Sequence, residues 1–325
     1  MNTKLLPAIC LAITLSVVAC SPWSSVTRTE LEPATAARSS CRLAAARSFA
    51  VLYSRLSVQQ VIAADPDVIV IDWMSGSNQC GEMDAAQVES LRSRPGDPRG
   101  DRIVLAHLDI GRTQPVRPVF SADAADGSCV PAVFIPTSVA APEGSVPRVD
   151  SADWAAFLAG GVNSAVERIA GLGFDGIYVD GIDAGIASLL PDQTAAIKMS
   201  GLLRHVAGRG REISPGFLVV VVNPVGIEKG NELVGVVDGV AVHQAMFAGG
   251  YVKPAAELTG ILASLNAFRA AGLPVLSVEF IDDGIQLSHY QTICNSMGYL
   301  CYPGVPAMNM LNRPFNAGNG GTCSR

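Results

Sequence analysis

The stretch "GFDGIYVDGID", residues 173–183, sets a short apolar run between glycines and carboxylates. Only 16% of the residues in the chain are charged, so three aspartates in this one stretch are unusual. Side chains alternate along a strand, so Tyr178 and Asp180 would point the same way. We interpret residues 176–180 as a strand that ends in a functional carboxylate, Asp180, with Asp183 one step into the loop. Asp175, at the other end, is expected to turn or cap the chain beside Gly176.

Seven further apolar runs are typical of strands, and helix-like stretches separate most of them. The runs span residues 49–53, 68–72, 103–109, 218–222, 239–243, 275–279 and 299–302. The clearest helical patterns span residues 84–94, 154–173, 193–210 and 255–272. Near-continuous apolar strands indicate a parallel sheet that is buried on both faces. The alternation predicts an α/β protein with a single (β/α)8 TIM barrel. A doubly wound open sheet is the alternative, but no Gly-x-Gly-x-x-Gly follows the first strand.

The N-terminal 40 residues are expected to lie outside the barrel. Residues 1–19 resemble a lipoprotein signal peptide, because Lys4 precedes 15 apolar residues, too few for a comfortable membrane span. The sequence "VVAC" ends this segment, so Cys20 is predicted to be the lipidated first residue of the mature chain. Residues 20–40 would form a flexible tether and residues 41–325 the barrel. We therefore expect an exported lipoprotein of the cell envelope, in the outer membrane or at the cell surface. An ordinary signal peptide or a membrane anchor is the alternative.

The net charge and the cysteine pattern limit the classes of partner and cofactor that the sequence supports. The formal net charge is -6, with 23 basic and 29 acidic residues, which argues against a nucleic-acid surface. We expect a monomer that recognises a neutral or cationic partner. No C-x-x-C pair occurs, so the sequence supports neither a zinc ribbon nor a thioredoxin-type site, and no cofactor is expected.

The mature chain keeps six cysteines besides Cys20, which suggests three disulfides in an exported protein. Cys80 and Cys129 lie in loops that would leave the same barrel face. We predict that they pair and hold the long insertion after the third strand, residues 110–153, over the cleft. The remaining bridges would come from Cys41, Cys294, Cys301 and Cys323 in one of three arrangements.

Polar residues stand at or just after the ends of many predicted strands. They are Asp72, Asp109, Asp180, Asn223, His243 and Glu279. In a barrel these ends converge on the face that carries the active site. To cap a helix or bind loop amides is the alternative role for Asp180 and the favoured role for Asp72 and Asp183. His107 and Asp109 share a face of the third strand, but a His-x-Asp pair is common, and no metal site is predicted.

The order of several motifs resembles glycoside hydrolase family 114, the endo-α-1,4-polygalactosaminidase-like barrels. These motifs are "VIVIDW" (68–73), "VLAHLDIG" (104–111), "GFDGIYVDGID" (173–183), "VVVVNP" (219–224), "VDGVAVH" (237–243), "LPVLSVEF" (273–280) and "GYLCYPG" (298–304). The resemblance implies a (β/α)8 barrel that cleaves α-1,4-linked galactosamine polymers with an aspartate and a glutamate. The family aspartate matches Asp180. The family glutamate falls at or beside His243, the family tyrosine on the third strand is His107, and the glutamate of the family's "IGE" is Arg112.

Glycoside cleavage usually needs two carboxyl groups, one to donate a proton and one to attack or to activate water. With Asp180 as one member, Glu279 is the best substitute for the second, followed by Asp109 and Asp72, while His243 could act as a general acid. The predicted substrate-binding residues are Asp72, His107, Asp109, Arg112, Tyr178, Asp183 and Asn223. The leading hypothesis is an O-glycosyl hydrolase that acts on a galactosamine-type exopolysaccharide. The first alternative is a non-catalytic carbohydrate-binding lipoprotein, and the second is a metal-assisted hydrolase.

Overall fold

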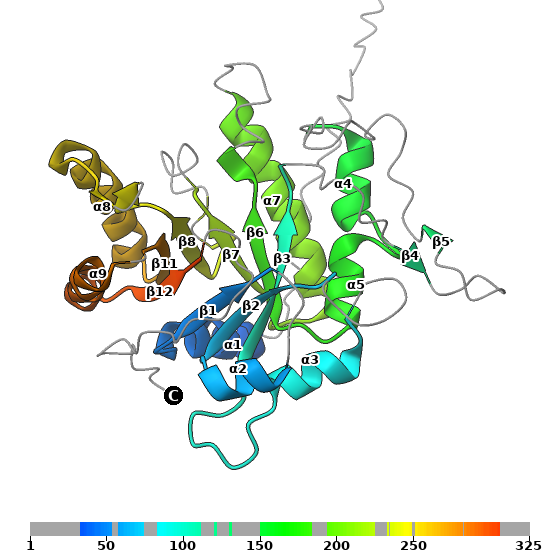
Figure 1. Ribbon diagram of the computed structural model, residues 1–325. Coiled ribbons are helices and arrows are strands. Elements are labelled where there is room, and N and C mark those ends of the chain that lie inside the picture. Colours follow the sequence, from blue (N-terminus) through cyan, green and yellow to red (C-terminus); the bar gives the residue numbers. More distant parts are fainter. Residues whose placement is uncertain are drawn as a thin grey trace, which may run out of the picture.

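The main sheet of the computed structural model contains eight parallel strands among the described residues, in the order β1-β2-β3-β6-β7-β8-β11-β12. They are β1 (Phe49–Leu52), β2 (Val68–Asp72), β3 (Ile103–Asp109), β6 (Gly176–Asp180), β7 (Leu218–Val222), β8 (Gly239–His243), β11 (Val275–Phe280) and β12 (Leu300–Gly304). The ring of Phe49 on β1 lies 5.9 Å from that of Tyr302 on β12, so the two outer strands approach each other. The sheet is a nearly closed barrel with helices around it (Figure 1). The predicted TIM-like α/β fold is confirmed.

The structure describes residues 33–53, 58–74, 83–111, 120–121, 130–131, 150–183, 194–224, 233, 235–248, 251–281 and 283–305. The predictions for Cys20, Cys80, Arg112, Cys129 and Cys323 lie outside these residues. So do the signal peptide and most of the insertion 110–153. No helix in the described part of the chain is both long enough and apolar enough to cross a membrane.

The helices follow the predicted alternation. They are α1 (Pro33–Ala45), α2 (Val58–Ala64), α3 (Ala85–Arg92), α4 (Ala152–Ala159), α5 (Ala165–Gly171), α7 (Thr194–Ile213), α8 (Ala255–Ala270) and α9 (Gly284–Met297). The single helix predicted over residues 154–173 is divided into α4 and α5. Gly161 and Asn163 between them have φ angles of 130° and 68°, which a continuous right-handed helix does not allow.

Two small antiparallel pairs complete the described elements. Strand β4 (Phe120–Ser121) pairs with β5 (Val130–Pro131), and β9 (Phe247–Ala248) pairs with β10 (Tyr251–Val252). The second pair follows directly after β8, so it stands at the carboxyl end of the barrel strands.

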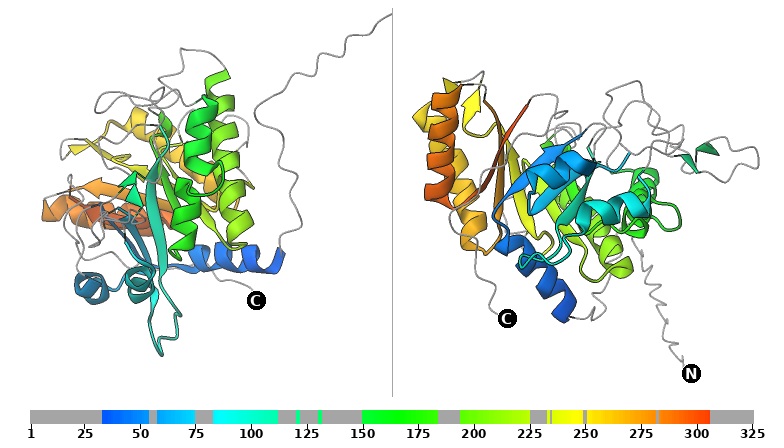
Figure 2. Two further views of the ribbon diagram at one scale, coloured as in Figure 1. Left: turned by 90° about the vertical axis from the view of Figure 1, so that its right-hand side faces the viewer. Right: turned by 60° about the horizontal axis from the view of Figure 1, so that its bottom comes forward.

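Helix α1 spans the predicted boundary between the tether and the barrel at residue 41. It crosses the end of the barrel where the strands begin (Figure 2). Ser40 donates a hydrogen bond of 2.5 Å to Asp238, just before β8, and Arg42 lies 3.5 Å from the carboxylate of Asp175, just before β6. The predicted boundary at residue 41 therefore falls inside an ordered helix, because polar side chains at the end of α1 find partners on the barrel.

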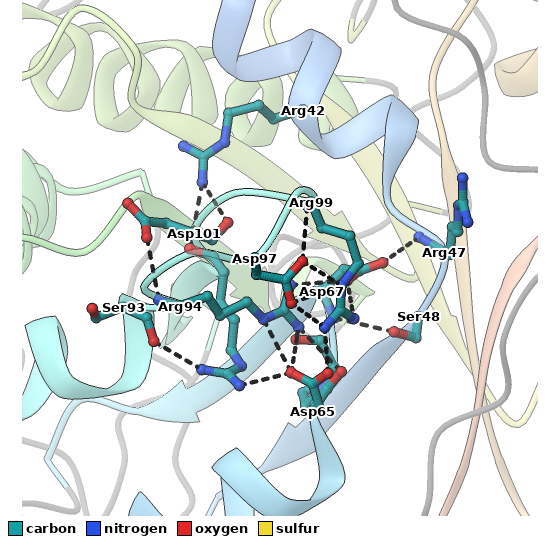
Figure 3. Close-up of polar contacts among 12 residues, drawn as sticks. Arg42, Arg47, Ser48, Asp65, Asp67, Ser93, Arg94, Asp97, Arg99 and Asp101 are labelled. Carbon is teal, nitrogen blue, oxygen red and sulfur yellow. Dashed lines mark hydrogen bonds and ion pairs between the residues drawn. The ribbon is translucent and has the colours of Figure 1, made fainter.

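Aspartates and arginines form a network at the same amino-terminal face, beside β2 and β3 (Figure 3). Arg94 is 7% exposed, and its guanidinium lies 3.0 Å from both Asp65 and Asp67. Arg99 bridges the same two aspartates, and Arg102 lies 2.7 Å from Asp65. In a barrel, charge pairing at this face serves stability, since the chemistry gathers at the opposite face.

Asp175 lies at the amino-terminal face as well. Its carboxylate accepts a hydrogen bond of 2.9 Å from the amide of Val104 and lies 3.4 Å from Arg92. It therefore links β6 to β3, a structural role like the one expected from its position before Gly176.

The described disulfide joins Cys294 on α9 to Cys301 on β12, with their Cα atoms 6.1 Å apart. Of the three arrangements left open by the sequence, this is the one that pairs these two cysteines. Cys41 is also disulfide-bonded.

Candidate active site

Register decides which strand residues point into the barrel. Asp72 lies opposite His107, and His107 lies opposite Tyr178. Two positions further along, Asp109 lies opposite Asp180. Paired residues on neighbouring strands share a face, as do residues two apart on one strand. Asp72, His107, Asp109, Tyr178 and Asp180 therefore face inward together at the carboxyl ends of β2, β3 and β6, and we call them the inner cluster.

Asp180 is the ionised centre of the inner cluster. Its side chain is 27% exposed, and its Oδ2 lies 3.3 Å from Nε2 of His107. Its Oδ1 accepts a hydrogen bond of 2.7 Å from the amide of Gly181. Burial raises the pKa of Asp180, but the His107 hydrogen bond, the charges of His107 and His243 and the Gly181 amide outweigh it and lower that pKa to about 2. The carboxylate is therefore negatively charged at neutral pH.

The glycine after Asp180 is required by the approach of Asp109. Gly181 has a φ angle of 80°, and a Cβ at this position would lie 2.0 Å from Oδ1 of Asp109. That oxygen accepts a hydrogen bond of 2.9 Å from the amide of Gly111. The "VDG" of the motif therefore packs the ends of β3 and β6 closely, which brings Asp109 and Asp180 to the same place.

His243 faces the inner cluster from β8. Its Nε2 lies 2.9 Å from the hydroxyl of Tyr178. Burial lowers the pKa of His243 to about 4, so the imidazole is neutral at neutral pH. Burial raises the pKa of Tyr178 well above its usual value, so its hydroxyl stays protonated. A neutral imidazole whose Nε2 is already in contact with Tyr178 is poorly suited to act as a general acid.

Glu279 does not join the inner cluster, so the structure does not bring this predicted second carboxylate to Asp180. His243 lies opposite Val278, so Val278 faces inward and Glu279 faces the surrounding helices. Its side chain is fully buried, and it accepts hydrogen bonds of 2.8 Å and 3.3 Å from the amides of Met246 and Phe247. Burial raises the pKa of Glu279 to about 7, against the opposing effect of these amides and of Lys253. Its role is to hold the segment after β8.

The other predicted residues have local partners. Asp72 is 5% exposed and accepts a hydrogen bond of 2.9 Å from the amide of Met74, the loop-amide role favoured for it. Asn223 accepts a bond of 3.1 Å from the amide of His243 and so fixes the end of β8. Asp183 is exposed at the end of the described segment.

The described residues contain no group of three or more His, Cys, Asp or Glu side chains that could hold a metal ion.

Tyr53 is a site residue that the sequence reasoning missed. It directly follows β1, and its ring lies 4.0 Å from the imidazole of His107 at an angle of 35°. Burial, together with the charges of Tyr178, Asp180, Asp109 and Asp72, raises the pKa of Tyr53 well above its usual value. The signal for Tyr53 in the sequence is its position as the last residue of the first apolar run, residues 49–53.

Comparisons with known proteins identify the fold. No family model matches the chain, and no curated protein matches it. One solved structure that is similar is the glycoside hydrolase domain of PelA from Pseudomonas aeruginosa, with a TM-score of 0.57. The match covers 81% of this chain and 96% of that chain at 18% sequence identity. This likeness shows the fold. It agrees with the barrel implied by the family resemblance.

Proposed function

We propose that this protein is a glycoside hydrolase that cleaves an O-glycosidic bond in a polysaccharide. The observation that carries the proposal is Asp180, an ionised carboxylate that His107 holds at the catalytic face of the barrel. The similar fold of the PelA glycoside hydrolase domain supports it. Positive charge develops on the sugar in the transition state of glycoside cleavage, and a fixed negative charge beside it lowers the barrier.

Asp109 is our choice for the second carboxyl group. The two carboxyls of a glycosidase lie about 5–9.5 Å apart. Asp109 and Asp180 are register partners on neighbouring strands, whose backbones lie about 4.8 Å apart, so their carboxyls start from suitable positions. Glu279 faces away, and His243 is neutral and bonded to Tyr178.

The substrate class follows from the charge of the inner cluster. Its five residues include three acidic side chains, Asp72, Asp109 and Asp180, of which Asp180 is ionised, and none of the five is Lys or Arg. Carboxylates accept hydrogen bonds and attract cations, so an ammonium group of the substrate would be favoured. We propose a polymer with free amino sugars, of the α-1,4-linked galactosamine type that the family resemblance implies.

The setting we propose is the cell envelope. The segment 1–19 with "VVAC" supports export and lipid attachment at Cys20. A lipid-anchored barrel would then act on polysaccharide at the membrane to which it is tethered.

The test is the release of reducing ends from α-1,4-linked galactosamine oligomers. Asp180→Asn keeps the shape of the side chain, removes its charge, and should lower kcat by about a hundredfold or more. The matched control is Glu212→Gln, which removes an exposed carboxylate at the end of α7, close to where β7 begins. Activity of Asp180→Asn within a few-fold of the wild type would contradict the proposal.

A second candidate is carbohydrate binding without cleavage. The observation that favours it is the end of β8, where the family glutamate is expected and a neutral His243 stands. In this case wild-type protein would bind the oligomers and release no reducing ends at any pH from about 4 to 9. Asp180→Asn would then weaken binding only moderately, as for the loss of one hydrogen-bond acceptor.

A further inference from the structure

Tyr53 has a hydroxyl group that the proposed reaction has not used. The oxygen is buried and has no hydrogen-bond partner within the described part of the chain. The ring is in contact with His107, whose Nε2 faces Asp180. The hydroxyl is thus fixed beside the inner cluster without being satisfied by it.

A buried polar group without a partner is uncommon in a folded protein and calls for a physical reason. The cost of leaving it unpaired is about 1–3 kcal/mol. Burial, together with Tyr178, Asp180, Asp109 and Asp72, raises the pKa of Tyr53 well above its usual value. The phenol therefore remains protonated and keeps a hydrogen to donate.

The ionised group of the inner cluster is an acceptor. The carboxylate of Asp180 only accepts hydrogen bonds, so it can bind the hydroxyl and ammonium groups of a sugar. The ring and glycosidic oxygens of a polysaccharide carry no hydrogen and need a donor. The hydroxyl of Tyr178 already has a hydrogen-bond partner, Nε2 of His243 at 2.9 Å, whereas the hydroxyl of Tyr53 has none among the described residues.

We propose that Tyr53 is a substrate-binding residue whose hydroxyl donates a hydrogen bond to an ether oxygen of the bound sugar. Its ring holds the imidazole of His107 in place beside Asp180. The proposal deepens the proposed function and rests on it, because the ligand is the same amino-sugar polymer. Tyr53 thus adds a substrate contact from β1, which β2 and β3 separate from β6, the strand that ends in Asp180.

The experiment compares two tyrosine-to-phenylalanine variants in full-length protein. Tyr53→Phe removes the unpaired hydroxyl, and Tyr290→Phe removes a buried hydroxyl that donates a bond of 2.7 Å to the carbonyl of Ser277. Binding of an α-1,4-linked galactosamine oligomer is measured by calorimetry in the Asp180→Asn background, where turnover is suppressed. The melting temperature of each variant is measured without ligand, and kcat/KM is measured with Asp180 intact.

Tyr53→Phe should raise Kd about tenfold and lower kcat/KM by a similar factor, as for the loss of one ligand hydrogen bond. Its melting temperature should be unchanged or higher, because an unpaired buried group is removed. Tyr290→Phe should show the opposite pattern: a melting temperature about 3–6 °C lower and an unchanged Kd.

An unchanged Kd for Tyr53→Phe would overturn the inference and leave the proposed function standing if the parent protein still cleaves the oligomer. A lower melting temperature with an unchanged Kd would assign the hydroxyl a structural role instead. If the parent protein neither binds nor cleaves the oligomer, the proposed function itself fails, and the role of Tyr53 fails with it.

Discussion

Replacing Glu279 by glutamine should remove a pH dependence from the stability of the barrel. The carboxyl group is fully buried among the helices, beneath the amides of Met246 and Phe247. Burial raises its pKa to about 7 from the usual 4.5, so the folded state holds a proton that the unfolded state releases. A glutamine of the same shape carries no such proton.

The sign and size follow from the two pKa values. A raised pKa stabilises the folded state fully below about pH 4.5, and this contribution is lost as the pH rises through about 7. The difference between 4.5 and about 7, at about 1.4 kcal/mol per pH unit, corresponds to a loss of about 3 kcal/mol. In a protein of this size it lowers the melting temperature by about 6–12 °C.

The assay is thermal unfolding of wild type and Glu279→Gln between pH 4.5 and 8, followed by circular dichroism. The wild type should lose stability relative to the variant over this range, and any fixed cost of the amide shifts the whole curve without changing its slope. Glu212→Gln is the control, because the exposed carboxylate of Glu212 pairs with Arg209 at the surface, where an ion pair contributes little to stability. Its curve should run parallel to that of the wild type. Parallel curves for Glu279→Gln and wild type would refute the reasoning.

Three further predictions concern other parts of the molecule. Arg94→Met should lower the free energy of unfolding by about 2–3 kcal/mol, measured by urea denaturation, because the carboxylates of Asp65 and Asp67 lose a buried partner; no change would mean that Arg99 and Arg102 compensate fully. Replacing Cys294 and Cys301 together by serine opens a short loop and should cost about 2.5 kcal/mol in the same assay, and a cost near zero would contradict the chain-entropy argument. Mass spectrometry of the native protein should find Cys20 as a lipidated first residue, whereas an unmodified chain that starts elsewhere would exclude the anchor.

The amino-acid sequence by itself determined the barrel and the position of Asp180 at the end of one of its strands. Five strands begin and end where the apolar runs predicted, namely β2, β3, β6, β7 and β8. The reason is local: runs buried on both faces are continuous in hydrophobicity and are bounded by polar residues or glycines. The alternation of side chains along β6 sufficed to place Tyr178 and Asp180 on one face, and register confirms that they lie with His107 and Asp109.

Only the tertiary structure decided which other groups accompany Asp180. Glu279 and His243 both end apolar runs, yet pairing His243 with Val278 turns Glu279 outward, since a shift of one residue exchanges the two faces of a strand. The ionisation of His243 and Glu279 depends on burial, which is a property of the packed barrel and not of the run that contains them. Tyr53 joins the site because a nearly closed barrel brings β1 beside the ends of β2 and β3 and sets its ring against His107, a contact between residues far apart in the chain.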